Sequence, residues 1–241
     1  MKKLFKKLKE EDHGAIGIGA MIVFIAMILV AGIAASVLVS TSNTIQIQAL
    51  STGSQTTKEV ASGLSVFEIV GEVNVTSSTN YDINYTAITV KARPGSGDID
   101  LNNTYILVSD GTTKTLVRYG HANSSDIYIA KGSMQGDLFD ALSGDDWDMC
   151  NQADFGIGVL QDYDSSCAQY QPVINRGDKA VLFLRCGAQP TGDSTAQAGV
   201  FGSEIAERTD VFGRIIPEVG APGVISFTAP MSYVDTIYTL Q

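Results

Sequence analysis

The feature that most constrains the fold is a run of 43 residues, 15–57, that contains no charged side chain. Its first part, residues 15–39, is continuously apolar and long enough to cross the ~30 Å hydrocarbon core of a bilayer as a helix. As one helix the whole run would reach about 65 Å, at roughly 1.5 Å per residue. This length exceeds what a membrane needs. Something other than lipid must therefore bury the rest, and many copies of the same helix are a natural candidate.

A short basic leader, residues 1–14, precedes this run. An ordinary secretory signal has its small-residue cleavage site after the apolar region, whereas here Gly14 and Ala15 come before it. Cleavage between them would remove only the charged head and leave the hydrophobic helix on the mature chain. From composition alone, the alternative is a signal anchor with its basic end inside the cell. The leader carries five lysines: Lys2, Lys3, Lys6, Lys7 and Lys9.

The remainder of the chain, about 180 residues, is long enough for one domain with its own core. It is rich in Gly, Ser, Thr, Asn, Asp and β-branched residues, which indicates short strands and loops. The whole chain has a net charge of −10, and from residue 15 onward it has 11 basic and 23 acidic residues. Such an acidic body argues against nucleic-acid binding.

Hydrophobic periodicity divides the chain into a helix and a β domain. Apolar and small residues recur at helical spacing through residues 40–62, and the pattern then changes to alternation. Asp110-Gly111 predicts a two-residue type I′ hairpin loop. We therefore expect an α+β chain: a leader at 1–14, a helix at 15–62, and an antiparallel, Ig-like β-sandwich or barrel at 63–241. The strands expected are 66–75, 88–93, 104–108, 113–119, 126–130, 179–186, 223–229 and 236–240.

The residues that usually carry catalysis are scarce in this chain. The two histidines are His13, in the leader, and His121, in a polar stretch. A Ser-His-Asp or Cys-His unit needs a positioned base, and zinc needs three or four His or Cys ligands at suitable spacing. A phosphate-binding glycine loop is also missing from the sequence. We therefore expect a protein that is not an enzyme.

Three cysteines follow the helix: Cys150, Cys167 and Cys186. An exported chain can form disulfides, and Cys150 and Cys167 bracket an Asp-rich loop, which makes them the expected pair. The alternative is that all three are reduced, partly buried thiols.

The Asp-rich loop is a candidate metal site. Carboxylate and carbonyl oxygens are the ligands of hard cations, so a structural Ca²⁺ or Mg²⁺ is one interpretation and a solvated acidic loop is the other. The spacing of an EF-hand is absent from the sequence. The candidate ligands are Asp145, Asp146, Asp148, Asp162 and Asp164.

Four Asn-x-Ser/Thr sequons lie between residues 74 and 123, at Asn74, Asn84, Asn102 and Asn123. A Thr-rich β segment produces sequons by composition alone. In an exported chain we favour N-linked glycans on an outward face of the domain.

The order of these N-terminal features resembles that of a known superfamily. His13-Gly14-Ala15 before an apolar helix is similar to the class III signal of type IV pilins and archaeal flagellins, in which a membrane peptidase cuts after the glycine. Bacterial-type pilins have Glu at the fifth mature position, where this chain has Gly19. The strings Gly17-Ile18-Gly19 and IVFIAM at 22–27 look like the N-terminus of archaeal flagellins (archaellins). The resemblance is close over 14–50, recurs in the closing strands at 217–241, and is looser at 174–186.

This resemblance implies a structural subunit of the archaeal flagellum (archaellum), which polymerises for swimming. Residues 15–39 would hold the precursor in the membrane, and after leader removal the helices of many subunits would form the filament core. The partners implied are the chain itself or sister archaellins, the preflagellin peptidase, and the assembly and motor machinery. Some archaellins also bind Ca²⁺ or Mg²⁺. Small side chains let helices approach closely, and larger ones such as Phe and Met would fill the remaining space. The core positions expected are Gly17, Gly19, Phe24, Ala26, Met27, Gly32 and Ala35.

Two other functions stay open at this point. One is an adhesive type IV-like pilin, and the other is a monomeric, membrane-anchored extracellular domain. The absence of Glu at position 19 favours archaellin over pilin, and the 43-residue uncharged run favours a polymer over a monomer.

Overall fold

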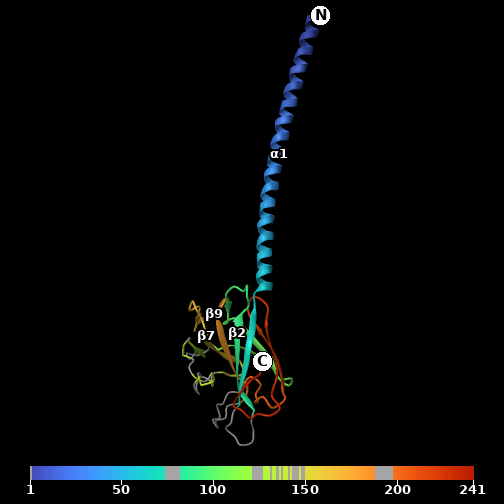
Figure 1. Cartoon of the computed structure of the whole chain (residues 1–241). Coiled ribbons are helices and arrows are strands. Elements are labelled where there is room, and N and C mark those ends of the chain that lie inside the picture. The colour runs from blue at the N-terminus through green and yellow to red at the C-terminus, as the bar shows by residue number, and fades with distance from the viewer. Residues whose placement is uncertain are drawn as a thin grey trace. The chain divides into compact units, whose positions relative to one another are not determined.

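The computed structural model describes residues 2–73, 82–120, 127–130, 132–133, 136, 138–140, 142, 147, 150–187 and 198–241, with side chains from residue 16 onward. One helix, α1 (Lys2–Ala61), spans 60 residues and is followed by a β domain (Figure 1). The chain divides into two compact units, Met1–Gln55 and Thr56–Gln241. The helix ends one residue before the expected boundary at 62, and its last turn belongs to the second unit.

The β domain is built on one long, strongly bent sheet with strand order β12-β11-β4-β5-β7-β10-β2-β1-β13. Most neighbours are antiparallel, while β7 pairs in parallel with β5 and with β6. A small second sheet has the order β3-β9-β8. The strands are β1 (Leu64–Val73), β2 (Ile83–Ala92), β3 (Ile99–Asp100), β4 (Tyr105–Ser109), β5 (Lys114–Tyr119), β6 (Tyr128–Ile129), β7 (Asp154–Gln161), β8 (Cys167–Ala168), β9 (Gln171–Ile174), β10 (Lys179–Arg185), β11 (Asp210–Ile216), β12 (Gly223–Thr228) and β13 (Ile237–Thr239).

The two halves of this sheet pack face to face around the main core. Ile106, Val117 and Ile215 from the β12-β11-β4-β5 half and Ile69 and Leu182 from the other half are all buried in one hydrophobic cluster. Alternation along the strands produces this arrangement, because every second side chain points inward. The prediction of a long helix followed by an antiparallel sandwich is confirmed.

The bent sheet nearly closes where β1 and β12 begin. The amide of Leu64 donates to the carbonyl of Ala221, and Gly63 forms an isolated bridge with Ala221. A Cβ on Gly63 would lie 2.4 Å from the oxygen of Ala221, and one on Gly220 would lie 2.4 Å from the oxygen of Ser62. Only glycine allows the two backbones to approach this closely.

Strands β2 and β10 are buried on both faces. Their inner side chains join the main core, and their outer side chains, including Ala87 and Phe183, pack in a second cluster. The ring of Trp147 covers this outer side: its centroid lies 4.2 Å from that of Tyr85 and 5.6 Å from that of Phe183. Burial on both faces accounts for the continuous apolar run VLFL at residues 181–184, which does not alternate.

The expected hairpin at Asp110-Gly111 exists, but its loop is longer than predicted. Lys114 pairs with Ser109, so four residues form the loop, and only Gly111 has a positive φ, of 86°. A type I′ turn would need positive φ at both central residues. Instead, one carboxylate oxygen of Asp110 accepts the backbone amides of Thr112 and Thr113 and organises the longer loop.

All eight expected strands have counterparts, and five strands were not expected: β3, β7, β8, β9 and β11. Strand β11 does alternate, with Val211 and Ile215 buried and Phe212 and Arg214 exposed. Strand β7 carries Gly156 and Gly158 within its apolar run, which weakens the strand pattern.

Candidate functional site

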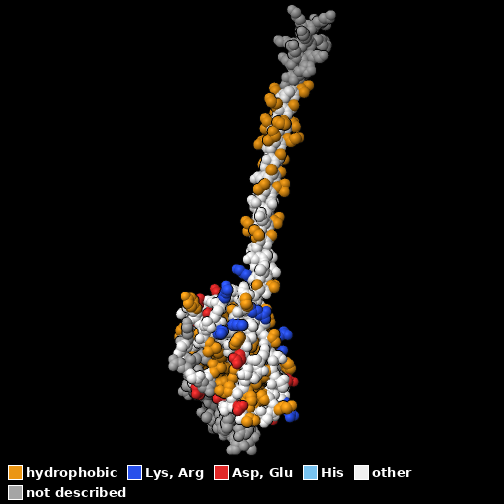
Figure 2. Space-filling view, in the orientation of Figure 1, with side chains coloured by type: hydrophobic (Ala, Val, Ile, Leu, Met, Phe, Trp, Pro, Cys, Tyr) orange, Lys and Arg blue, Asp and Glu red, His pale blue; other side chains and the backbone are white. Residues whose placement is uncertain are grey.

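Helix α1 is the first candidate site because its apolar side chains are uncovered. Over residues 16–60 every side chain is exposed, and the segment Ile16–Ala61 is apolar enough to cross a membrane by length and composition. Figure 2 shows hydrophobic side chains spread along this helix. Exposed apolar surface of this extent is unfavourable in water. The helix must therefore lie in lipid or against other protein.

Two threonines of the helix bond their hydroxyls to its own backbone. The hydroxyl of Thr41 donates to the carbonyls of Val37 and Leu38, and that of Thr44 donates to the carbonyl of Ser40. A hydroxyl bonded back to the preceding turn does not need water. These two hydroxyls can therefore enter a dry environment without an unsatisfied donor.

The expected core positions are distributed around the helix and not on one stripe. At about 100° per residue, Gly17, Phe24 and Ala35 lie on one side, while Gly19 and Ala26 lie on the opposite side. A Cβ added at Gly17, Gly19 or Gly32 would meet nothing within 4 Å. Within the described residues, nothing therefore requires glycine at these positions. Met27 and Gly32 lie at further angles, so several neighbours could contact one helix.

The predicted cleavage site lies within the backbone of α1. Gly14 and Ala15 are helical, and their side chains are outside the described part. Cleavage at this bond stays a prediction.

Three carboxylates of the β domain come together at one end of β7 and β10. Ligand oxygens of Asp162, Asp164 and Asp178 all lie within 4.8 Å of one another. Asp162 and Asp178 are buried, which a solvated loop does not explain, and Asp164 is exposed. Such a group of oxygens is the type of site that a hard cation prefers.

Backbone amides organise the same loop. The Asp162 carboxylate accepts the amides of Ser166 (3.3 Å) and Cys167 (3.1 Å). The Asp178 carboxylate accepts those of Tyr163 (3.4 Å) and Asn175 (3.0 Å). These bonds hold the two buried carboxylates in fixed positions and give their oxygens hydrogen-bond donors.

Two of the five expected metal ligands, Asp162 and Asp164, thus lie in this cluster. The other three, Asp145, Asp146 and Asp148, lie outside the described residues, as does His121. The sequence reasoning missed Asp178. Asp178 follows Asn-Arg-Gly in the turn before β10. It is separated in sequence from Asp164, so nothing in the sequence indicates that this turn lies beside the loop that follows β7.

The predicted disulfide between Cys150 and Cys167 is wrong. All three cysteines are free and buried, and Cys150 packs in the outer cluster whereas Cys167 belongs to the main core. Burial, with the nearby carboxylates of Asp162 and Asp178, raises the pKa of the Cys167 thiol to about 12. Burial raises the pKa of Cys186 to about 12 as well. These thiols therefore stay protonated and unreactive at neutral pH.

The sequons differ in position. Asn102 is exposed in a turn before β4, where a glycan has room. Asn84 is fully buried in β2, and its side-chain oxygen accepts the amide of Gly187. The glycan predicted at Asn84 is therefore wrong for the folded domain, because a sugar on this amide has no space. Asn74 and Asn123 lie outside the described residues.

The fold and the helix together define a class: a β-sandwich subunit on a long apolar helix that the chain itself leaves uncovered. The chain belongs to the archaeal-type flagellin family, whose model matches residues 14–227. It is 41% identical over 239 residues to flagellin B2 of Methanocaldococcus jannaschii, and the match covers 99% of both chains.

Two solved structures are similar in fold. The crystal structure of flagellin FlaB1 from Methanocaldococcus jannaschii is 30% identical, with a TM-score of 0.59 over 75% of this chain and 98% of that one. The archaeal flagellum of Methanospirillum hungatei is 14% identical, with a TM-score of 0.54 over 93% of this chain and 98% of that one. The second likeness concerns the fold alone. It extends over most of the chain, including part of α1.

Proposed function

We propose that this chain is the structural subunit of an archaellum filament and polymerises through helix α1. The observation that carries the proposal is the uncharged helix, whose side chains from Ile16 onward are exposed and whose small residues lie on several sides. A helix that several neighbours cover buries this surface, whereas a bilayer covers only about 20 residues of it. Close packing of helices at small residues supplies the contact energy without any catalytic step.

The same helix would serve twice. Before processing, it holds the precursor in the membrane, with the five leader lysines on the cytoplasmic side. Cleavage between Gly14 and Ala15 by a preflagellin peptidase then removes the charged leader, which could not be buried in a dry filament core. The assembly and motor machinery of the archaellum would insert and rotate the polymer at the cell surface, alone or with sister archaellins.

Glycans and a cation belong to the proposal as surface features. Asn102 is exposed and suits an N-linked glycan. The cluster of Asp162, Asp164 and Asp178 suits a structural Ca²⁺ or Mg²⁺, whose charge would offset that of two buried carboxylates. Neither feature takes part in a reaction.

The experiment is a gene deletion in the producing archaeon, with the chain restored from a plasmid. The deletion strain should lose swimming or form altered filaments, and peptides of this chain should be present in filaments purified from the complemented strain. Loss of surface attachment with normal swimming would favour the adhesive pilin. If peptides of this chain occurred in the membrane fraction and never in filaments, the monomeric ectodomain would be correct.

A further inference from the structure

The outer face of strands β12, β11, β4 and β5 carries apolar side chains that the domain leaves uncovered. We call it the four-strand face. Leu116, Phe212 and Val224 are 55%, 55% and 57% exposed, and Tyr105 is 46% exposed. Each belongs to a different strand, so the apolar surface continues across the half-sheet. An apolar surface that extends over four strands is a common mark of a protein contact.

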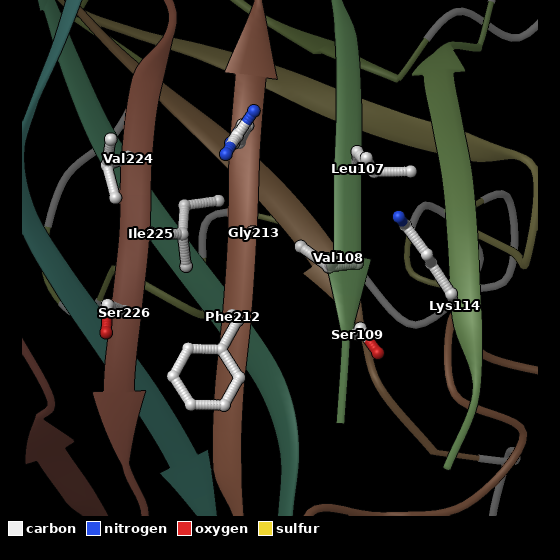
Figure 3. A pocket seen from close by; sticks show the side chains of 10 residues that line it. Leu107, Val108, Ser109, Lys114, Phe212, Gly213, Val224, Ile225 and Ser226 are labelled. Atoms are coloured by element: carbon white, nitrogen blue, oxygen red, sulfur yellow. The ribbon is translucent and has the colours of Figure 1, made fainter. Parts of the chain in front are cut away.

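The strand register places one row of side chains directly across this face. Val224 lies opposite Arg214, Arg214 opposite Leu107, and Leu107 opposite Leu116. Phe212 lies in the next row, opposite Ser226 on one side and Ser109 on the other. A shallow groove of about 570 Å³ lies on this face. Figure 3 shows side chains that line it on four neighbouring strands, among them Leu107, Phe212 and Val224.

The charges on this face are of one sign at its centre. Arg214 lies in the middle row, and Lys114 and Arg118 project from β5. Arg118 lies 3.5 Å from Asp154. For Lys114 and Arg214, the described part of the chain offers no carboxylate within 4 Å. From residue 15 onward the chain carries only 11 basic residues against 23 acidic ones. Asp210, which is also on the outer face of β11, lies at the end of the strand, and its carboxylate accepts the hydroxyl of Thr228 (2.6 Å). With three cations and this one carboxylate, the four-strand face is net basic, whereas the rest of the chain from residue 15 onward is predominantly acidic.

We propose that the four-strand face docks on an acidic surface of a second copy of this chain. The inference rests on the proposed function, because filament assembly would bring copies together. The apolar side chains would be buried at the centre of the contact, and Arg214 and Lys114 would meet carboxylates of the neighbour.

Charge also decides the symmetry of this contact. Two four-strand faces packed on each other would bring Arg214 and Lys114 near the same cations of the partner, which costs free energy. The contact is therefore between two different surfaces, and such a contact propagates into an open helix unless it closes into a ring. Helices already joined in a core raise the local concentration of the domains, so a weak contact is sufficient.

The first test reverses a charge in the full-length chain in its own archaeon. Arg214→Glu should lower the yield of intact filaments roughly tenfold while the amount of membrane-inserted chain stays unchanged, because a carboxylate then faces carboxylates. Lys91→Glu is the matched control: it changes a cation on another part of the sheet, and it should assemble normally. Normal filaments from Arg214→Glu would overturn the docking proposal and leave the filament function itself standing.

The second test measures whether the four-strand face is covered by protein in assembled filaments, and it does not require a variant that fails to assemble. Leu116→Cys gives an accessible thiol beside three native thiols that are buried. Its maleimide labelling should be roughly tenfold slower in filaments than in detergent-solubilised chain. Phe67→Cys, at a site 54% exposed on another strand, is the control and should not slow equally. Equal rates for Leu116→Cys in both states would contradict the proposal, and so would equal slowing at both sites.

A maleimide–diazirine cross-linker on the thiol of Leu116→Cys then identifies the partner surface. The proposal predicts interchain cross-links to acidic segments outside 105–119 and 210–228. Cross-links mainly to the same four strands of the neighbour would show the symmetric contact and overturn it.

Discussion

Gly32 is the residue at which the polymer can be separated most clearly from a simple membrane anchor. In the single chain a Cβ on Gly32 would meet nothing within 4 Å, and leucine favours a helix by about 1 kcal/mol over glycine. In a packed core the added side chain would overfill the contact, at about 1–3 kcal/mol per site. Gly32→Leu should therefore insert into the membrane at normal levels and fail to form filaments, as judged by membrane immunoblots and electron microscopy.

The control for that substitution is Ile33→Leu, which conserves volume at the next position and should assemble. Full-length filaments from Gly32→Leu would mean that neighbouring helices do not approach closely at this residue, and the anchored-ectodomain interpretation would gain support.

Asn102 and Asn84 form an internal comparison for glycosylation. Peptide mass spectrometry of native filaments should find a glycan on Asn102, which is exposed, and none on Asn84, which is buried. Asn102→Gln should remove that glycan and leave the melting temperature of the domain nearly unchanged, since exposed substitutions usually change stability by less than about 0.5 kcal/mol. A glycosylated Asn84 would contradict the burial described for β2.

Asp164 allows the cation to be tested without disturbing the buried carboxylates. After chelator treatment, millimolar Ca²⁺ or Mg²⁺ should raise the melting temperature of filaments by several degrees, since a ligand that binds only the folded state stabilises it. In Asp164→Asn this increase should become much smaller, because one anionic ligand is lost while the side chain stays exposed. The measurement is calorimetry with and without added ion, and an unchanged melting temperature in the native chain would exclude a structural cation.

At the scale of elements, the account predicts that the leader is removed and the helix is kept on the mature chain. Purified filaments should contain a mature subunit that begins at Ala15, as N-terminal sequencing would detect. Gly14→Leu should leave uncleaved precursor in the membrane and no filaments, because the predicted cleavage site then lacks its small residue. Ile16→Leu keeps the predicted site and should be processed normally. A mature N-terminus after Ala35 would instead indicate an ordinary signal peptide and would remove the helix from the filament.

The helix and most of the alternating strands could be predicted from the sequence, because each buries or exposes its side chains with a regular period. Strand β11 also alternates but was not predicted. Strands β2 and β10 were found through their β-branched and aliphatic residues, although their coverage by Trp147 was not foreseen. Strand β7 was missed because two glycines interrupt it. The position of Asp178 beside Asp162 depends on how distant loops meet, and local periodicity carries no information about such a contact.

The predictions of a Cys150–Cys167 disulfide and of a glycan at Asn84 failed for a related reason. Cys150 and Cys167 are close in sequence, but the fold assigns them to two separate clusters. Asn84 belongs to a matching sequon, yet its strand is central and covered on both faces. The motifs identified side chains of the right type for a disulfide or a glycan. Their burial in the fold then decides whether a partner or a sugar can reach them.

At the scale of the whole molecule, the account makes one central claim: the uncharged helix becomes the core of a filament made of this chain. The direct measurement is an electron cryomicroscopy map of surface filaments from the producing archaeon, at a resolution that shows side chains. The account predicts that helices beginning at Ala15 pack together along the filament axis, with the β domains outside. A map in which residues 15–57 are absent from the filament, or lie outside its core, would contradict the account.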